Sequence, residues 1–112
     1  MKNIIKFFYL IFLLCSSANA LGATEVVERE IIIKNHKFEP DIIEVQAGVK
    51  IRLTIHNRDS TIEEFDSPDL KREKIIPGNS TAYIVLAPLK PGKYFFMGEF
   101  HASSAKGYLV IN

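Results

Sequence analysis

Sulfur-containing and tryptophan residues are scarce in this sequence, which has one cysteine, Cys15, two methionines and no tryptophan. Cys15 lies in an N-terminal segment that we expect to be removed, so the rest of the chain can form neither a disulfide nor a cysteine-ligated metal site. An excess of one charge is also lacking, because 14 lysines and arginines stand against 13 aspartates and glutamates. This balance provides no general basic field for nucleic acid or an anionic membrane.

Long apolar runs are absent except at the N-terminus, where residues 7–15 are apolar without interruption. Lys2 and Lys6 precede this run, and residues 18–20 match the small-residue cleavage site of a signal peptide. The run is shorter than the about 20 residues needed to cross a bilayer. We therefore expect residues 1–20 to be a cleaved signal peptide and the protein to be periplasmic, with no stable membrane insertion after cleavage.

Residues 30–112 are predicted to form one domain behind a short lead-in, residues 21–29, because a chain of this size builds one hydrophobic core. Short β-branched and aromatic runs alternate with glycine- and proline-containing turns, a pattern typical of an all-β, antiparallel sandwich or closed sheet. In residues 50–57 apolar and polar side chains alternate, which predicts one buried face and a solvent-facing His56. Residues 70–76 fit either a short edge strand or an irregular connection.

Five motifs in chain order carry a resemblance to a known family: residues 31–40, 43–48, 57–65, 89–92 and 98–101. Together they resemble the cupredoxin-like domains, and most closely the exported ones that accompany bacterial iron permeases. The Glu-Glu-Phe and Gly-Glu-Phe-His motifs are fairly specific to that branch. The resemblance implies a cupredoxin-like Greek-key β-sandwich that binds copper or iron and assists iron uptake, with an iron permease or a companion periplasmic metal-binding protein as partner.

The chain departs from the electron-transfer cupredoxins at the metal ligands. Those proteins have a histidine where this chain has Glu63, and a cysteine at the end of the penultimate strand, followed by a histidine and a methionine. Here Met97 stands roughly at the cysteine position, and residues 102–105 contain no methionine after His101. A blue-copper centre is therefore excluded, and a nitrogen and oxygen ligand set suits Cu(II), iron or manganese better than Cu(I).

His101 and Glu99 are candidate ligands in the loop after the last aromatic strand. In an extended chain, residues two apart point to the same side, so both side chains can face one ion. The alternative is an exposed polar turn. The carboxylate from the other loop is predicted to be Glu63 rather than Glu64, because Glu63 shares its side of the strand with Phe65.

Two further residues, His36 and Met97, complete the predicted metal ligands. His36 either binds the metal or hydrogen-bonds a surface turn, and Met97 is either a weak soft ligand or a core residue packed against aromatic rings. A Cu(II) ion held by such a set could accept an electron from Fe(II). The same ligands would serve a carrier without redox change, so the sequence leaves enzymatic activity undecided. The alternative function is a structural or interaction domain that binds no metal.

Overall fold

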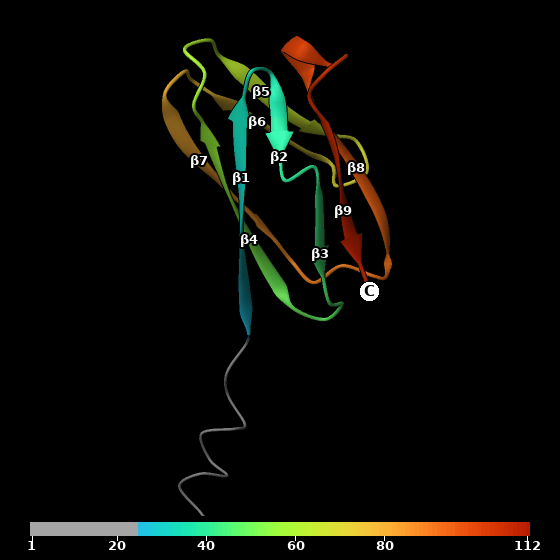
Figure 1. Ribbon diagram of the computed structural model, residues 1–112. Coiled ribbons are helices and arrows are strands. Elements are labelled where there is room, and N and C mark those ends of the chain that lie inside the picture. The colour runs from blue at the N-terminus through green and yellow to red at the C-terminus, as the bar shows by residue number, and fades with distance from the viewer. Residues whose placement is uncertain (1–24) are drawn as a thin grey trace, which may run out of the picture.

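The structure is a computed structural model that describes residues 25–112 (Figure 1). It contains nine strands and one 3-10 turn, and their bounds are β1 Val26–Lys34, β2 Lys37–Glu39, β3 Ile42–Val45, β4 Lys50–Asn57, β5 Glu63–Ser67, β6 Arg72–Ile76, β7 Ser80–Leu86, β8 Gly92–Gly98, η1 Glu99–His101 and β9 Lys106–Ile111.

The strands form two sheets that face each other as a sandwich (Figure 1). One sheet has the order β2-β1-β4-β7, and the other has the order β3-β9-β8-β5-β6. Most neighbours are antiparallel, but β1 pairs with β4 and β3 pairs with β9 in parallel. The all-β sandwich is confirmed, and the predicted antiparallel pairing holds except at these two pairs. A parallel pair needs a crossover connection, here made by intervening strands.

Alternation along each strand decides which side chains enter the core. On β4, Ile51, Leu53 and Ile55 are fully buried, while the intervening side chains lie on the outer face. His56 is on that outer face, as its position in the pattern predicts, and its side chain is partly exposed. The inner faces of both sheets therefore supply one continuous apolar core, as expected for a chain of this length.

Three aromatic rings from different strands fill the upper part of the core. Phe96 lies 5.2 Å from Phe65 and 5.2 Å from Phe38, measured between ring centroids. Phe38 comes from one sheet, and Phe65 and Phe96 come from the other. The rings therefore join the two sheets close to the end of the sandwich that carries Glu63, the first residue of β5.

The turn between β1 and β2 has two residues with left-handed backbone conformations, Asn35 with φ 53° and His36 with φ 58°. Positive φ at both central residues is the requirement of a two-residue hairpin turn whose twist matches its strands. Asparagine tolerates this conformation, but histidine adopts it less often. Contacts outside the turn therefore have to hold His36 in place.

Two sequence expectations change at element boundaries. Residues 70–76, which had no definite assignment, contain β6, an edge strand next to β5. The assumption of an extended chain through Glu99 and His101 is wrong, because residues 99–101 form η1. In a 3-10 turn, residues two apart no longer share a side, since each residue rotates by one third of a turn.

The predicted signal peptide, residues 1–20, lies outside the described residues. Among residues 25–112, no helix has the length and apolar character needed to cross a membrane.

Candidate metal site

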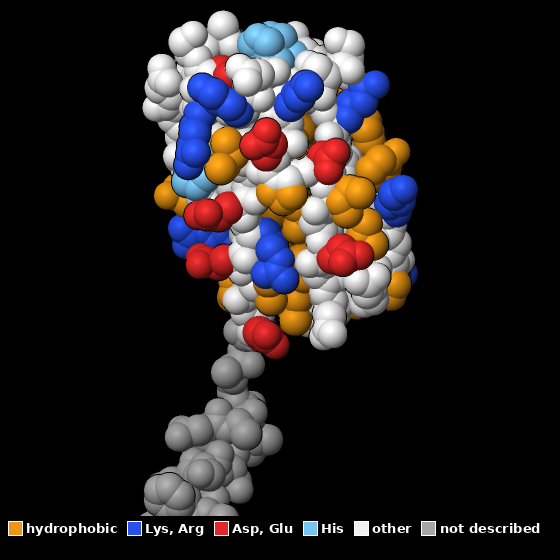
Figure 2. Space-filling view, viewed as in Figure 1, with side chains coloured by type: hydrophobic (Ala, Val, Ile, Leu, Met, Phe, Trp, Pro, Cys, Tyr) orange, Lys and Arg blue, Asp and Glu red, His pale blue; other side chains and the backbone are white. Residues whose placement is uncertain are grey.

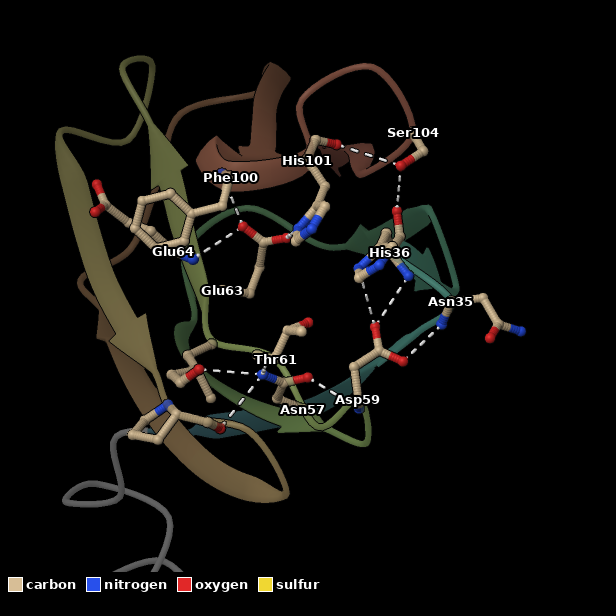
Figure 3. A network of polar contacts seen from close by, with 12 residues as sticks. Asn35, His36, Asn57, Asp59, Thr61, Glu63, Glu64, Phe100, His101 and Ser104 are labelled. Carbon is tan, nitrogen blue, oxygen red and sulfur yellow. Dashed lines mark hydrogen bonds and ion pairs between the residues drawn. The ribbon is translucent and has the colours of Figure 1, made fainter.

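Glu63 is a nearly fully buried carboxylate, with 2% of its side chain exposed. Alternation along β5 turns Glu63 and Phe65 inward and leaves Glu64 on the other face, as the sequence predicts. The Oε1 atom of Glu63 accepts hydrogen bonds from the backbone N–H groups of Glu64 and Phe100, each at 3.0 Å. Its Oε2 atom lies 2.6 Å from Nδ1 of His101 (Figure 3). These three hydrogen bonds offset the loss of hydration of the buried carboxylate.

The contact with Glu63 fixes the role of the His101 ring. A carboxylate only accepts hydrogen bonds, so Nδ1 of His101 is the donor in this pair. The remaining ring nitrogen, Nε2, then carries the free lone pair in the neutral imidazole. This carboxylate-to-imidazole arrangement is the one that orients metal-binding histidines in proteins, where the carboxylate holds the ring and the other nitrogen binds the ion.

His36 lies directly against His101. The two rings are stacked, with centroids 3.6 Å apart and planes inclined by 10°. They come from residues far apart in the sequence, the β1–β2 turn and η1, and the hydroxyl of Ser104 joins the two segments by donating to the His36 carbonyl at 2.6 Å. The exposed fraction of the side chain is 42% for His36 and 27% for His101. The pair therefore forms a solvent-facing imidazole surface at one pole of the sandwich.

Asp59 holds His36 in its left-handed conformation. Its carboxylate accepts the backbone N–H groups of Asn35 and His36 at 2.8 and 2.9 Å, and its Oδ2 lies 3.5 Å from Nδ1 of the His36 ring (Figure 3). The hydrogen bond from the His36 backbone is the main cause that lowers the pKa of Asp59 below its ordinary value. Each stacked imidazole thus has a carboxylate on its Nδ1 side.

Asn57 supports Asp59 from the interior. This buried side chain accepts the Asp59 N–H at 3.1 Å and donates to the Thr61 carbonyl at 2.8 Å. Its amide also donates to the carbonyls of Ile76 and Pro77. The loop between β4 and β5 is therefore anchored on both sides of Asp59. Sequence analysis missed both Asp59 and Asn57. Asp59 lies in a loop, which has no alternation that would indicate where a side chain points, whereas Asn57 ends β4 in phase with the buried side chains of that strand, and that alternation could have indicated its inward direction.

Met97 and Glu99 are not brought to the histidine pair. Met97 pairs with Asp66 in the β5–β8 register, and it lies on the face opposite to the buried Phe96. Glu99 is exposed, and its charge acts on Glu64, on the outer side of β5. Of the predicted ligands, the structure thus brings together His36, Glu63 and His101. Glu63 contacts the Nδ1 side of the His101 ring, opposite the nitrogen that is free to bind an ion.

Gly98, not Met97, is the inward-facing residue at the end of β8. A Cβ atom there would lie 2.7 Å from Cδ of Glu63 and 2.8 Å from Cβ of Ala105. The space next to Gly98 is filled by the Glu63 carboxylate. Met97, predicted as a soft ligand or a core residue, therefore lies on the face of β8 that points away from Glu63, because neighbouring residues on a strand face opposite ways.

The donor set fits a hard or borderline metal ion through the two imidazole nitrogens. Both rings have their Nδ1 sides next to carboxylates, and imidazole suits copper, iron and zinc. A different set of three side chains within residues 25–112 has potential ligand atoms that all lie within 4.8 Å of one another. These are Glu64, Asp66 and Glu73, on the outer face of β5 and β6. Exposed acidic groups of this kind are common in proteins without any bound ion.

The architecture and the site define the class of protein as a β-sandwich with a histidine-bearing pole, and residues 25–112 contain no cysteine that could supply a thiolate. A family model for the cupredoxin-like domain matches residues 4–111, and the chain belongs to this family. The uncharacterized protein RP394 of Rickettsia prowazekii (strain Madrid E) is 54% identical over 87 residues, which are 78% of this chain and 70% of that protein.

Solved structures agree on the fold. The metal-binding domain of the Streptococcus pneumoniae D39 Cu(I)-exporting P-type ATPase CopA, with Cu(I), has a TM-score of 0.68 at 19% identity, over 81% of this chain and 99% of that chain. Auracyanin A, a blue copper protein from Chloroflexus aurantiacus, has a TM-score of 0.68 at 17% identity, over 79% of this chain and 100% of that chain. At these identities the likeness establishes the shared architecture alone.

Proposed function

We propose that this protein binds a single Cu(II) or iron ion through the Nε2 atoms of His101 and His36. The observation that carries the proposal is the 2.6 Å contact between the buried Glu63 carboxylate and Nδ1 of His101. That contact orients the ring and increases the basicity of its other nitrogen. Glu63 and Asp59 then act behind the two histidines, and solvent completes the coordination. Bound copper would supply one-electron redox chemistry that the protein's own side chains lack.

The stacked geometry implies a small movement on binding. A nitrogen lone pair lies in the plane of its ring, so the lone pairs of two parallel rings do not converge on one ion. His36 is the ring that turns, because it is the more exposed of the two and sits on a turn. His101 stays fixed by its buried partner. We therefore expect His101 to be the stronger determinant of affinity.

Titration of the purified protein with Cu(II), Fe(II) and Fe(III) by calorimetry tests the proposal. We expect one ion per chain, loss of binding in His101→Ala and weaker binding in His36→Ala. His56→Ala is the matched control, because His56 is on the outer face of β4 and should not affect binding. Glu63→Gln should weaken binding by about 10-fold to 100-fold, as for other residues that orient a metal-binding histidine.

Electron paramagnetic resonance of the Cu(II) protein gives an independent measurement. Nitrogen couplings from two imidazoles support the proposed ligands, and unchanged couplings in His101→Ala contradict them.

A specific observation favours the alternative of an interaction domain: Glu63, Gly98 and Ala105 together fill the interior near His101. If no ion binds at all, the alternative replaces our proposal.

A role in iron uptake is the finer part of the proposal, and it rests on the resemblance to the exported cupredoxin-like proteins of iron-permease systems. We propose that the chain is exported by its N-terminal segment and delivers iron to such a permease, or oxidises Fe(II) when loaded with copper. Ferrous oxidation in air, measured with and without bound copper, separates the two. Copper-dependent acceleration that is lost in His101→Ala supports oxidation, and binding of iron without acceleration supports delivery.

A further inference from the structure

Three cationic residues lie side by side across β2, β1 and the end of β4, close to the histidine pole. Lys34 and Lys37 are directly opposite each other in the antiparallel pair of β1 and β2. Both face outward, because Ile33 and Phe38 next to them are buried. Arg58 follows β4, and its backbone N–H donates to the carbonyl of Ile33 at 2.9 Å. Figure 2 shows lysine and arginine side chains across the upper part of this face, just below the histidines at the top.

These cations lack close ion-pair partners. Within residues 25–112, no carboxylate lies within 4.0 Å of the charged groups of Lys34, Lys37 or Arg58. Asp59 is near enough to interact with Lys34, but its oxygens accept the N–H groups of the β1–β2 turn. Like charges directly opposite each other in a sheet are destabilising. A bound anion would remove that repulsion.

Two of these cations, Lys34 and Arg58, border a hollow of about 430 Å³ that opens to solvent. Besides Lys34 and Arg58, the lining includes His56, Asn79, Ser80 and Thr81, and Nε2 of His56 lies 3.4 Å from Oε1 of Glu30. His56 Nδ1 lies 2.9 Å from Thr81 Oγ1, which joins the β4 and β7 parts of the wall. Cationic and hydroxyl groups converge here on one concave surface without any acidic residue in its lining.

We propose that this hollow binds a small polyanion through phosphate or carboxylate oxygens. The planar guanidinium of Arg58 can hold two oxygens at once, and Lys34 supplies a second charge. The volume falls in the range of small-molecule sites, about 300 to 1,000 Å³. A row of three cations on a chain of nearly balanced charge is too short for a nucleic-acid surface. The site is separate from the histidine pair and does not depend on metal binding.

Calorimetry with metal-free protein tests the proposal, using inorganic phosphate and citrate as separate probes at low and high ionic strength. We expect at least one probe to bind, more weakly at high ionic strength because salt screens the attraction. Lys34→Gln and Arg58→Gln should each weaken binding by about tenfold, equivalent to 1.4 kcal/mol. Lys90→Gln is the control, since Lys90 is exposed in the connection from β7 to β8, away from the hollow.

Nuclear magnetic resonance with the same probes locates the site. Shift changes centred on Ser80, Thr81 and Arg58 support it, and the preferred probe identifies phosphate or carboxylate as the ligand chemistry. The proposal is overturned if neither probe binds, or if Arg58→Gln binds as well as Lys90→Gln. Anion binding should persist in His101→Ala, so that failure here and failure of the metal proposal give different results. Thermal unfolding of each variant confirms that it is folded.

Discussion

Glu63 and Glu64 are adjacent carboxylates on opposite faces of β5, and their surroundings differ completely. Glu63 is buried with two backbone N–H groups and an imidazole as partners. Glu64 is on the outer face next to Asp66 and Glu73. Partial loss of hydration, with the charges of Glu73 and Asp66, raises the pKa of Glu64 above its ordinary value. The difference shows that hydrogen-bond partners, more than exposure, decide whether a carboxylate is well accommodated.

The largest effect is expected from removing the inner carboxylate. Glu63→Ala leaves two backbone N–H groups and Nδ1 of His101 without their acceptor, so the free energy of unfolding should fall by about 3 kcal/mol. Glu64→Ala is the matched control and should cause a much smaller change. Urea unfolding of both variants measures the difference. Equal losses of stability would contradict the contrast between the two faces.

The close packing of the inner carboxylate can be tested at Gly98. A methyl group there would come within 2.7 Å of Cδ of Glu63 and 2.8 Å of Cβ of Ala105, in a place where neither neighbour can easily move. Gly98→Ala should therefore reduce the free energy of unfolding by about 2 kcal/mol. Ser103→Ala, at an exposed position of the next loop, is the control. A stability equal to that of the control would show that Glu63 has room to move.

Asp59 provides an intermediate case, a partly exposed carboxylate with backbone N–H partners. Asp59→Asn should reduce the free energy of unfolding by about 1 kcal/mol, because the charge is lost and one of the two accepting oxygens becomes an NH2 group that cannot accept. The pKa of Asp59 is lowered in the folded state. Its contribution is thus complete above the ordinary aspartate value of about 3.9 and is lost as the pH falls through the lowered value.

Unfolding measured from neutral to acidic pH checks this expectation. The difference between the parent protein and Asp59→Asn should be constant near neutrality and disappear in strong acid. A difference that grows on acidification would reverse the sign and contradict the assignment. The backbone signals of Asn35 and His36 should change in the variant, because their N–H groups are the donors.

The smallest effect is expected on the outer face. Glu73→Gln removes one of the charges that raise the pKa of Glu64, so that pKa should move down toward its ordinary value. A raised carboxyl pKa means that ionisation costs the folded state stability as the pH rises, and the variant should be slightly more stable near neutrality. Nuclear magnetic resonance titration of the Glu64 carboxyl carbon measures the shift. An unchanged pKa would show that the charge of Glu73 is not among the causes of the raised value.

The sequence predicted the fold and the inward side chain of Glu63 because both depend on alternation with a period of two. It placed Glu63 and His101 at one site but did not predict that Glu63 hydrogen-bonds Phe100 and His101 directly, 37 and 38 residues later in the chain. The same limit explains Met97. Alternation indicates that neighbouring residues face opposite ways, but only the register of β5 with β8 shows that Gly98 is the inward one.

His36 and Asp59 illustrate what local patterns leave out. The stack of His36 on His101 joins two turns from opposite ends of the domain sequence, and no periodic pattern links them. Asp59 was missed because its role is to bind the backbone of another loop. A signal was nevertheless present, since an aspartate in a turn commonly accepts hydrogen bonds from backbone groups.

The direction of β1 determines where the two imidazoles can reach. This strand begins at the pole where β9 ends, and it finishes at the histidine turn (Figure 1). Nine residues of strand extend about 30 Å. A label, surface or fusion partner joined before Val26 or after Asn112 is consequently held on the far side of the molecule, and a second molecule can approach the imidazoles head-on. Immobilising the protein by either terminus is therefore a suitable format for presenting this pole to metal complexes and to candidate partners.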